Sequence, residues 1–472
     1  MGHVAGDSRY QRILLGPSLD EQVEAAHPVR VIDAFVEGLD LAALGFSKVA
    51  AEETGRPPYH PGDLVKLYLY GYANTVRSSR RLEREAERNL EVLWLINRLS
   101  PSFKTIADFR KDHVEAIVGV CRAFVQFCRG QSLYGGVLVA VDGSKVEAVA
   151  SRKTVVTPQS LEKQADAIDR KIAEHLAGMD EADRQEAEEP LVDVAAALQA
   201  LRDKRAVVQA QAEALAATGR NHQVPGEPEA RLMRTARHGH QVAYNAQTSV
   251  DAKHGLIAAF ELSSESNDQR MLLAMALQAK AALQVETLTV VADTGYSNGE
   301  QGQACAAAGI TAIVPRPQTV NPRGEQYFSR QAFSYDAAGD AYRCPAGQML
   351  TRRALSRTEN KAQYTTKACA ACALKPRCTK AARRTIIRDF HEDARQAMHE
   401  RASLDPAWMR HRRCLAEHPF ATMKSMMGYP HFLLRGLKKA KAEMALTVLG
   451  FNLKRVITIL GVPALLAKLQ AA

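Results

Sequence analysis

The chain has 472 residues, of which 46% are hydrophobic, and its formal net charge is +10. This length allows about two to four domains, and the hydrophobic content is that of a globular protein rather than a disordered one. No run of about 18 apolar residues occurs, and the N-terminus lacks a charged segment followed by an apolar stretch, so we expect a cytoplasmic protein without a membrane partner. The positive charge favours nucleic acid as a partner, although solubility alone would also explain the charge.

The first predicted domain, residues 1–130, is helical and has no sheet. Stop signals at 55–58 and 100–101 divide it into short helices. Four arginines recur at helical spacing and would share one helix face: Arg77, Arg80, Arg84 and Arg88. Such a row could follow DNA phosphates, or it could be a solvated face in which Arg80 pairs with Glu83 and Glu87.

Two apolar strands further on each end in an aspartate. Asp142 follows the apolar run 137–141, and Asp293 follows the run 288–292. Glycine beside Asp142 would let a backbone or a phosphate approach closely. Each aspartate alone could equally be a turn residue, because aspartate and glycine commonly occur together in turns.

The elements around these strands predict an α/β fold with mixed strand pairing. Residues 157–217 carry two apolar stripes that indicate an antiparallel helical hairpin, begun by Thr157-Pro158 and turned between Gly178 and Pro190. Strands are expected at 241–247, 256–260 and 311–314, with a helix after Asn267-Asp268 and another near 304–308. The order is strand, hairpin pair, helix, strand, helix, strand, then a polar insertion and long helices.

A third acid, Glu417, lies on a predicted helix that starts after Asp405-Pro406. On a continuous helix it would share one face with Arg410, Arg413 and Lys424. An Arg413–Glu417 surface ion pair is the simpler interpretation. Pro419 should kink or restart this helix and move Lys424 away from the ideal face.

Three carboxylates that converge repel one another unless cations neutralise them, and oxygen ligands suit Mg²⁺ or Mn²⁺. We therefore predict a metal site at Asp142, Asp293 and Glu417. Among rival acids near the same strand ends, Asp268 is interpreted as a helix cap and Glu147 as the alternate face of a strand. The other rivals are Asp251, Glu265 and Glu300.

Eight cysteines in so long a chain do not form a disulfide framework. Four of them have spacing that suits tetrahedral structural zinc: Cys344, Cys369, Cys372 and Cys378. The alternative is four reduced thiols in a loop. Basic residues flank this cluster and would make it a DNA clamp: Lys375, Arg377, Lys380, Arg383, Arg384 and Arg388. The remaining cysteines lie in helical patterns and are expected in the core: Cys121, Cys128, Cys305 and Cys414.

Taken together, these motifs resemble the DDE transposases of bacterial insertion sequences, in the branch with a long helical N-terminal domain. Besides the Asp142 and Asp293 strands and the cysteine insertion, the resemblance is carried by the segments 55–61, 77–80, 105–110 and 417–420. A signature helix of this superfamily places Tyr, Arg, Glu and Lys at fixed spacing. Arg413, Glu417 and Lys424 match it, whereas Arg410 occupies the tyrosine position.

The resemblance implies an RNase H-like catalytic domain at 131–460, with the hairpin inserted at 157–217 and a small zinc-ribbon-like insertion at 321–388. Asp142, Asp293 and Glu417 would bind two Mg²⁺ or Mn²⁺ ions, assisted at the DNA by Arg413 and Lys424. The protein would act as a homodimer on the terminal inverted repeats of its element, cleave a strand and transfer it to target DNA. Two alternatives are a catalytically inactive DNA-binding protein and an RNase H-like host nuclease.

Overall fold

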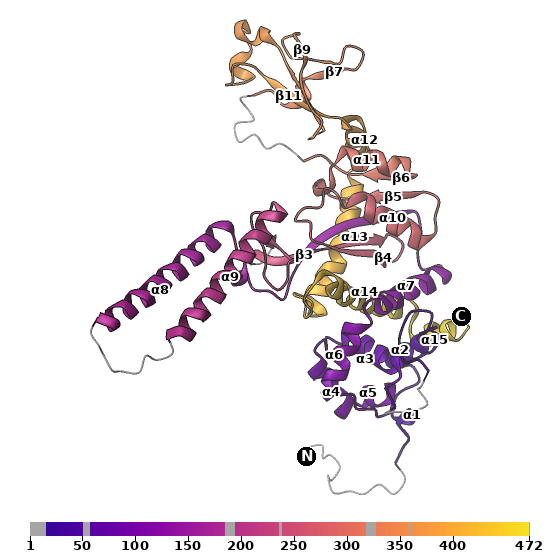
Figure 1. Cartoon of the computed structure of the whole chain (residues 1–472). Helices are drawn as coiled ribbons and strands as arrows, with labels where there is room; N and C mark the ends of the chain where they lie inside the picture. Colours follow the sequence, from indigo (N-terminus) through magenta and orange to yellow (C-terminus); the bar gives the residue numbers. More distant parts are fainter. Residues whose placement is uncertain are drawn as a thin grey trace, which may run out of the picture.

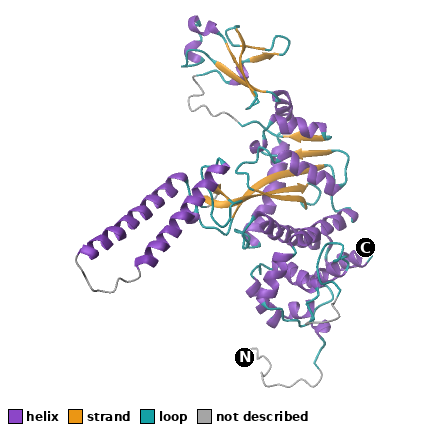
Figure 2. Cartoon of the chain, viewed as in Figure 1, coloured by secondary structure: helices purple, strands orange, loops and turns teal. Residues whose placement is uncertain are grey.

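The structure is a computed structural model that describes residues 16–50, 57–184, 194–235, 238–317, 327–358 and 360–471 (Figure 1). A central sheet with helices on its faces occupies the middle of the molecule. The N-terminal helices lie at one end and a small β subdomain lies at the other, while a two-helix arm projects to the side (Figure 2). The fold is mixed α/β, as predicted.

The described residues up to 130 form helices and no strand, as the sequence predicts. The predicted stop at 100–101 lies between two helices, whereas Gly55 and Arg56 lie outside the described residues. The helices are α1 (Leu19–Gln22), α2 (Pro28–Glu37), α3 (Pro61–Ala73), α4 (Ser79–Arg88), α5 (Leu90–Leu95), α6 (Phe103–Asp112) and α7 (Val114–Gly130).

Helix α14 (Leu437–Leu460) lies between the N-terminal helices and the central sheet, and it contacts α3, α7 and β4. A buried charge pair helps to fix this packing. Arg110 of α6 lies 3.6 Å from Glu443 of α14 and donates to the hydroxyl of Tyr72 in α3 over 3.1 Å. Burial raises the pKa of Glu443, and Arg110 opposes that rise. The last helix, α15 (Val462–Gln470), packs on α2. Among the described residues, no single helix is long and apolar enough to cross a membrane.

The central sheet contains β1 (Leu138–Glu147), β2 (Arg231–Thr235), β3 (Gly239–Asp251), β4 (Ile257–Ser263), β5 (Leu288–Val291) and β6 (Ile310–Ile313). The order is β2-β3-β1-β5-β6, and β4 also pairs with β3. Strands β1, β5 and β6 are parallel, whereas β3 is antiparallel to β1, β2 and β4. The mixed pairing is as predicted, but the sequence analysis missed β2.

The pairing of β1 with β5 determines where the two aspartates lie. Ala140 pairs with Val291. Asp142 lies two residues after Ala140, and Asp293 lies two residues after Val291. Because side chains two residues apart in a strand point to the same face, Asp142 and Asp293 are brought to one face at one edge of the sheet. The apolar side chains below them pack on Ala402 and Ala416, from the helices α12 (Glu392–Leu404) and α13 (Ala407–Ala421).

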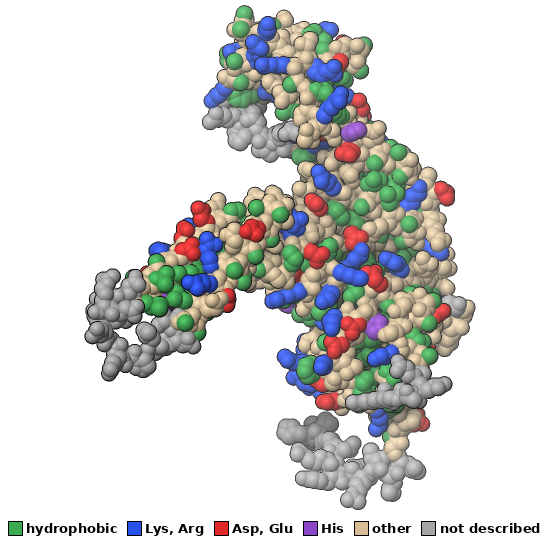
Figure 3. Space-filling view, viewed as in Figure 1, with side chains coloured by type: hydrophobic (Ala, Val, Ile, Leu, Met, Phe, Trp, Pro, Cys, Tyr) green, Lys and Arg blue, Asp and Glu red, His purple; other side chains and the backbone are tan. Residues whose placement is uncertain are grey.

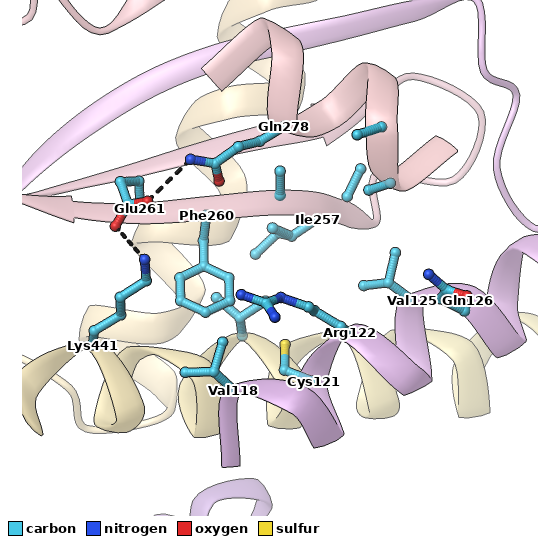
Figure 4. Close-up of a pocket in the computed structure, with 15 residues that line it drawn as sticks. Val118, Cys121, Arg122, Val125, Gln126, Ile257, Phe260, Glu261, Gln278 and Lys441 are labelled. Atoms are coloured by element: carbon cyan, nitrogen blue, oxygen red, sulfur yellow. Dashed lines mark hydrogen bonds and ion pairs between the residues drawn. The ribbon is translucent and has the colours of Figure 1, made fainter. Parts of the chain in front are cut away.

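Helix α10 (Leu272–Leu283) covers the opposite face of the sheet, and α11 (Gly299–Ala307) packs beside it. A cleft of about 480 Å³ lies between α7, β4, α10 and α14 (Figure 4). Its walls are largely apolar, and its rim holds Glu261, which accepts from Lys441 over 2.7 Å and from Gln278 over 3.0 Å. None of the predicted site residues lines this cleft.

The projecting arm consists of α8 (Pro158–Arg184) and α9 (Val194–Thr218), in the segment where the stripes predict a hairpin. Thr157 caps α8 through the backbone amide of Ser160, as expected. The seam between the helices is apolar near the base and carries an ion pair of 3.0 Å between Arg205 and Asp169 further out. The predicted turn begins too early, because α8 continues through Gly178 to Arg184, and the rest of that turn, residues 185–190, lies outside the described part of the chain.

The cysteine-rich insertion contains a second sheet, which the sequence analysis did not predict. Its five antiparallel strands have the order β11-β10-β9-β8-β7. They are β7 (Ser334–Asp336), β8 (Ala341–Arg343), β9 (Met349–Ser356), β10 (Lys361–Thr365) and β11 (Thr385–Asp389). They enclose their own small core, formed by Phe333, Tyr342, Leu350, Ala362, Tyr364 and Ile386. The start of the predicted insertion, 321–326, is outside the described residues.

Candidate active site

The two aspartates lie at the edge defined by β1 and β5, but their local structures differ. Asp293 follows β5 and begins the short 3₁₀ helix η2 (Thr294–Tyr296), where its carboxylate accepts from the amide of Gly295 over 2.8 Å. Asp142 does not end its strand, contrary to expectation, because β1 continues to Glu147 and pairs with β3 throughout. Asp142 therefore stands on a strand where the neighbouring β5 has already ended.

The side chains of Asp142, Asp293 and Glu417 are drawn together by a single arginine, Arg412 of α13. One terminal nitrogen of Arg412, Nη2, lies 2.7 Å from the carboxylate of Asp142 and 3.6 Å from that of Asp293. The other, Nη1, lies 3.4 Å from the carboxylate of Glu417. Segments distant in the sequence thus meet at one guanidinium group.

Among the described residues, no group of three acidic, histidine or cysteine side chains is arranged to hold one metal ion. The guanidinium of Arg412 stands where a cation would neutralise the three carboxylates. Its Nε atom is buried and has no hydrogen-bond partner. The oxygen-rich donor set suits Mg²⁺ or Mn²⁺ chemically, with Arg412 as the stand-in cation.

The three acids differ in exposure and therefore in electrostatics. The side chain of Asp142 is 13% exposed, whereas those of Asp293 and Glu417 are 43% and 55% exposed. Burial raises the pKa of Asp142 to about 6; Arg412 opposes this rise, and the carboxylate of Asp293 adds to it. The pKa of Asp142 is higher in the folded state than its ordinary value of 3.8. This carboxyl therefore lowers the free energy of unfolding as the pH rises from 3.8 to about 6. The site thus carries negative charge that one arginine only partly offsets.

The helix that carries Glu417 presents a different arginine from the one predicted. Arg410 and Arg413 are exposed, whereas the side chain of Arg412 is 12% exposed and reaches the acids. Spacing on an ideal helix favours Arg413 as the partner of Glu417, because it lies four residues before it. The same spacing rule gives no reason to choose Arg412, which lies five residues before Glu417. The long arginine side chain can cross the helix surface, which residue spacing alone does not reveal.

Pro419 does not break this helix. Helix α13 runs through it to Ala421 and continues as the π-helical turn η6 (Thr422–Met426). Lys424, on that turn, donates to the hydroxyl of Ser144 over 2.6 Å and to the carbonyl of Lys145 over 2.8 Å. The expectation that Pro419 moves Lys424 away from the acids is wrong. The π turn directs the side chain of Lys424 to β1, beside Asp142.

Comparison with known families gives two matches along the chain. Residues 17–112 match the model described as "Transposase domain (DUF772)", and residues 343–457 match the "Transposase DDE domain". The resemblance to DDE transposases is confirmed. The second match includes Glu417 and the four cysteines, and both support a transposase function. Asp142 and Asp293 lie outside the two matched segments, so their assignment rests on the geometry.

Comparison with curated proteins gives no match. Among solved structures, the chain is similar to a piggyBac transposase in a synaptic complex with hairpin DNA, determined by cryo-EM. The identity is 8%, the match covers 92% of this chain and 82% of that chain, and the TM-score is 0.26. The relation to transposases rests on the two family matches.

The four cysteines within the DDE-domain match line one cavity of about 20 Å³. Cys344 starts a turn in which Gly347 has a positive φ of 74°, and the other three lie around the 3₁₀ helices η4 (Lys367–Ala371) and η5 (Lys375–Arg377). Burial raises the pKa of Cys378, and its cysteine neighbours add to the rise. Elsewhere in the described chain, the cysteines expected in the core are buried except Cys414, which is exposed.

The structure separates Arg77 from the other arginines of the predicted row. Helix α4 begins at Ser79, and Arg77 before it is buried, donates to the carbonyl of His431 over 2.9 Å and lies over the ring of Tyr429. Arg80 and Arg84 are exposed, and Arg80 stacks on Phe103. Arg88 pairs with Glu85 over 2.6 Å. The surface row therefore consists of Arg80, Arg84 and Arg88, which are three of the four arginines on α4.

A buried polar network supports both aspartate segments from the other face of the sheet. The amide of Gln247 donates to Asp268 over 2.7 Å and accepts from the hydroxyl of Tyr296, which lies in the turn after Asp293. Asp268 also accepts from Lys145 over 3.1 Å. The interpretation of Asp268 as a helix cap is wrong: α10 begins at Leu272, and no side chain caps it.

This network explains the glycine beside Asp142. A Cβ atom at Gly143 would lie 2.1 Å from the Gln247 amide nitrogen and 2.7 Å from an Asp268 oxygen. The glycine therefore admits the Gln247 side chain, which is itself completely buried. From the sequence alone, a phosphate or a backbone is expected to approach there.

We predict that Gly143→Ala lowers the free energy of unfolding by about 1–3 kcal/mol, because the new methyl group displaces a packed amide and its hydrogen bonds. Urea denaturation followed by circular dichroism measures the loss. Gly130→Ala is the control, since a Cβ atom there meets nothing within 4 Å. Equal urea midpoints for the two variants would show that the packing of Gln247 against Gly143 does not contribute to stability.

Proposed function

We propose that the protein is a transposase that binds the terminal inverted repeats of an insertion sequence and catalyses metal-dependent strand cleavage and strand transfer. The observation that carries the proposal is the meeting of Asp142, Asp293 and Glu417 around one cationic group. The two family matches support the same reaction class.

An RNase H-like core is the fold that we propose for the catalytic domain. Its support is the position of the three acids: Asp142 on β1, Asp293 just after the adjacent parallel strand β5, and Glu417 on a helix that packs across the same face. This arrangement places the carboxylates at one edge of the sheet, where a DNA backbone can reach them. The arrangement also explains why the acids are so far apart in sequence.

The proposed mechanism assigns the acids to metal binding and the basic residues to DNA. Bound by these carboxylates, two ions such as Mg²⁺ or Mn²⁺ would activate a water or 3′-hydroxyl nucleophile and stabilise the leaving oxygen. Asp142 forms the rigid part of the site, because it stands within a paired strand. Glu417 is the most exposed of the three. Lys424 is held at β1 by Ser144, and with the exposed Arg413 it would contact the phosphates.

The proposal predicts that Asp142→Asn preserves DNA binding and abolishes cleavage, because an amide no longer supplies the anionic oxygen while the fold is retained. Excision of a donor plasmid that carries the element's own ends measures cleavage, and a gel-shift assay measures binding. Glu300→Gln, in the exposed first turn of α11, is the control and should remain active.

Metal-dependent nicking by Asp142→Asn would reject the assignment of this residue. Activity on any DNA, irrespective of the repeats, would favour a host nuclease. Repeat binding without excision by the unaltered chain would identify a catalytically inactive DNA-binding protein.

We further propose that α4 contacts DNA through Arg80, Arg84 and Arg88, and that Arg77 has a structural role instead. The β7–β11 subdomain provides a second basic surface, where lysine and arginine side chains outnumber acidic ones on the face seen in Figure 3. Within that subdomain, Arg384 and Arg388 are engaged internally, over the rings of Phe333 and Tyr335. Arg377 also lies over a ring, that of Phe328, but it is exposed. The candidates for DNA contact there are the exposed Arg377, Lys380 and Arg383.

For Arg84→Ala we expect weaker DNA binding and a log–log salt slope reduced by about 0.9, the contribution of one phosphate contact in duplex DNA. Fluorescence anisotropy with a duplex at several salt concentrations gives the slope. The matched control is Lys438→Ala, an exposed cation on α14 that faces Glu115. Equal reductions in both variants would indicate a general charge effect rather than a contact made by α4.

We propose that the four cysteines of the small subdomain bind structural zinc. The support is that all four cysteines line a single small cavity and come from two tight turns. Four thiolates are a donor set of closed structural zinc sites. The described geometry does not gather three of the sulfurs around one point. The donor types and the cavity fit the ion, and its coordination would draw the turns together.

The expected result for zinc is one ion per chain, lost in Cys369→Ser and retained in Cys414→Ser, because Cys414 lies on α13 outside the cavity. Elemental analysis after gentle purification measures the content. Absence of zinc from the unaltered protein, or equal content in both variants, would contradict the proposal.

By resemblance to insertion-sequence transposases, we also propose that two copies of the chain act together on the paired element ends. Their place of action would be the bacterial cytoplasm, on the nucleoid.

A further inference from the structure

Arg412 is held at the candidate metal site almost entirely by the acids themselves. Its guanidinium contacts all three carboxylates through Nη1 and Nη2, and its side chain is 12% exposed. The remaining nitrogen, Nε, is buried and has no hydrogen-bond partner. A guanidinium normally uses its planar set of donors in full, so this position reflects attraction to the negative charge rather than ideal hydrogen bonding.

The charges at this point do not balance. Three carboxylates face one arginine, and a carboxylate cluster of this kind still attracts a further cation. A divalent ion bound by the same three carboxylates would require the oxygens that Arg412 now contacts. It would also repel the guanidinium at short range in a partly buried site. The arginine and the metal ion therefore exclude each other.

We propose that Arg412 is a resident competitor for the metal: it holds the three carboxylates together without the ion and must swing out for the ion to bind. This inference rests on the proposed function, because it concerns the same carboxylates. Removing the competitor raises metal affinity, and a released guanidinium is free to bind a phosphate, as arginine does readily. Metal binding and DNA binding would then favour each other.

The test compares Arg412→Gln with Arg413→Gln in the full-length protein. Both variants lose one positive charge from the same helix, but the side chain of Arg413 is exposed. Mn²⁺ is the probe, and electron paramagnetic resonance of free Mn²⁺ gives the dissociation constant without any assay of activity. We expect roughly tenfold tighter binding in Arg412→Gln, because a neighbouring cation is lost from a partly buried site, and a change within about twofold in Arg413→Gln.

Equal or weaker Mn²⁺ binding in Arg412→Gln than in the unaltered protein would overturn the inference. Should that variant fail to fold, Arg412→Met replaces it: methionine keeps an aliphatic stem that can pack as the arginine stem does but carries no charge, so the affinity must still rise. Asp142→Asn separates the two proposals. If it binds Mn²⁺ as well as the unaltered protein does, the metal site itself is misassigned. If it loses binding while Arg412→Gln gains none, only the role of Arg412 is wrong.

Discussion

The interaction on which the site depends is the repulsion among three carboxylates and the cation that offsets it. The parallel pairing of β1 and β5 puts Asp142 and Asp293 on one face, and α13 adds Glu417 across that face. The fold thus concentrates negative charge at a sheet edge, which costs free energy unless a cation is present. In the structure Arg412 provides that cation, and in the proposed reaction divalent ions would take it over.

The opposite face of the same strands shows how so unfavourable a cluster is kept in place. Gln247 passes over Gly143, contacts Asp268 and accepts from Tyr296, so one buried amide links the segments of both aspartates. Buried polar groups stabilise a structure when they are satisfied and fix a unique arrangement. One face of these strands therefore carries the acids, and the buried amide network on the other face fixes the positions of the segments that bear Asp142 and Asp293.

The sequence was sufficient for features that follow from periodicity along one segment. The helical arm and the start of α13 after Asp405 are of this kind, whereas the mixed strand pairing was predicted from the order of the elements along the chain. Features that depend on contacts between segments were missed or misassigned. The sequence position of Asp268, before a helix, predicts a helix cap. Its hydrogen-bond partners Lys145 and Gln247 instead lie on the strands β1 and β3. Arg413 has the better spacing, but the length of the arginine side chain allowed Arg412 to reach the acids. The five-stranded sheet of the insertion has strands as short as three residues, too short for a clear period of two.

The burial of Arg77 points to a link between the N-terminal helices and β1, the strand that carries Asp142. Arg77 donates to the carbonyl of His431, and the next residue, Phe432, donates its amide to the carbonyl of Glu147 at the end of β1. The same segment follows the π turn that carries Lys424, and Glu443 beyond it pairs with Arg110. A chain of contacts therefore runs from the residues just before α4 to β1, the strand that carries Asp142. An arginine that the sequence pattern places in an exposed row is, by its contacts, part of the packing between the N-terminal helices and β1.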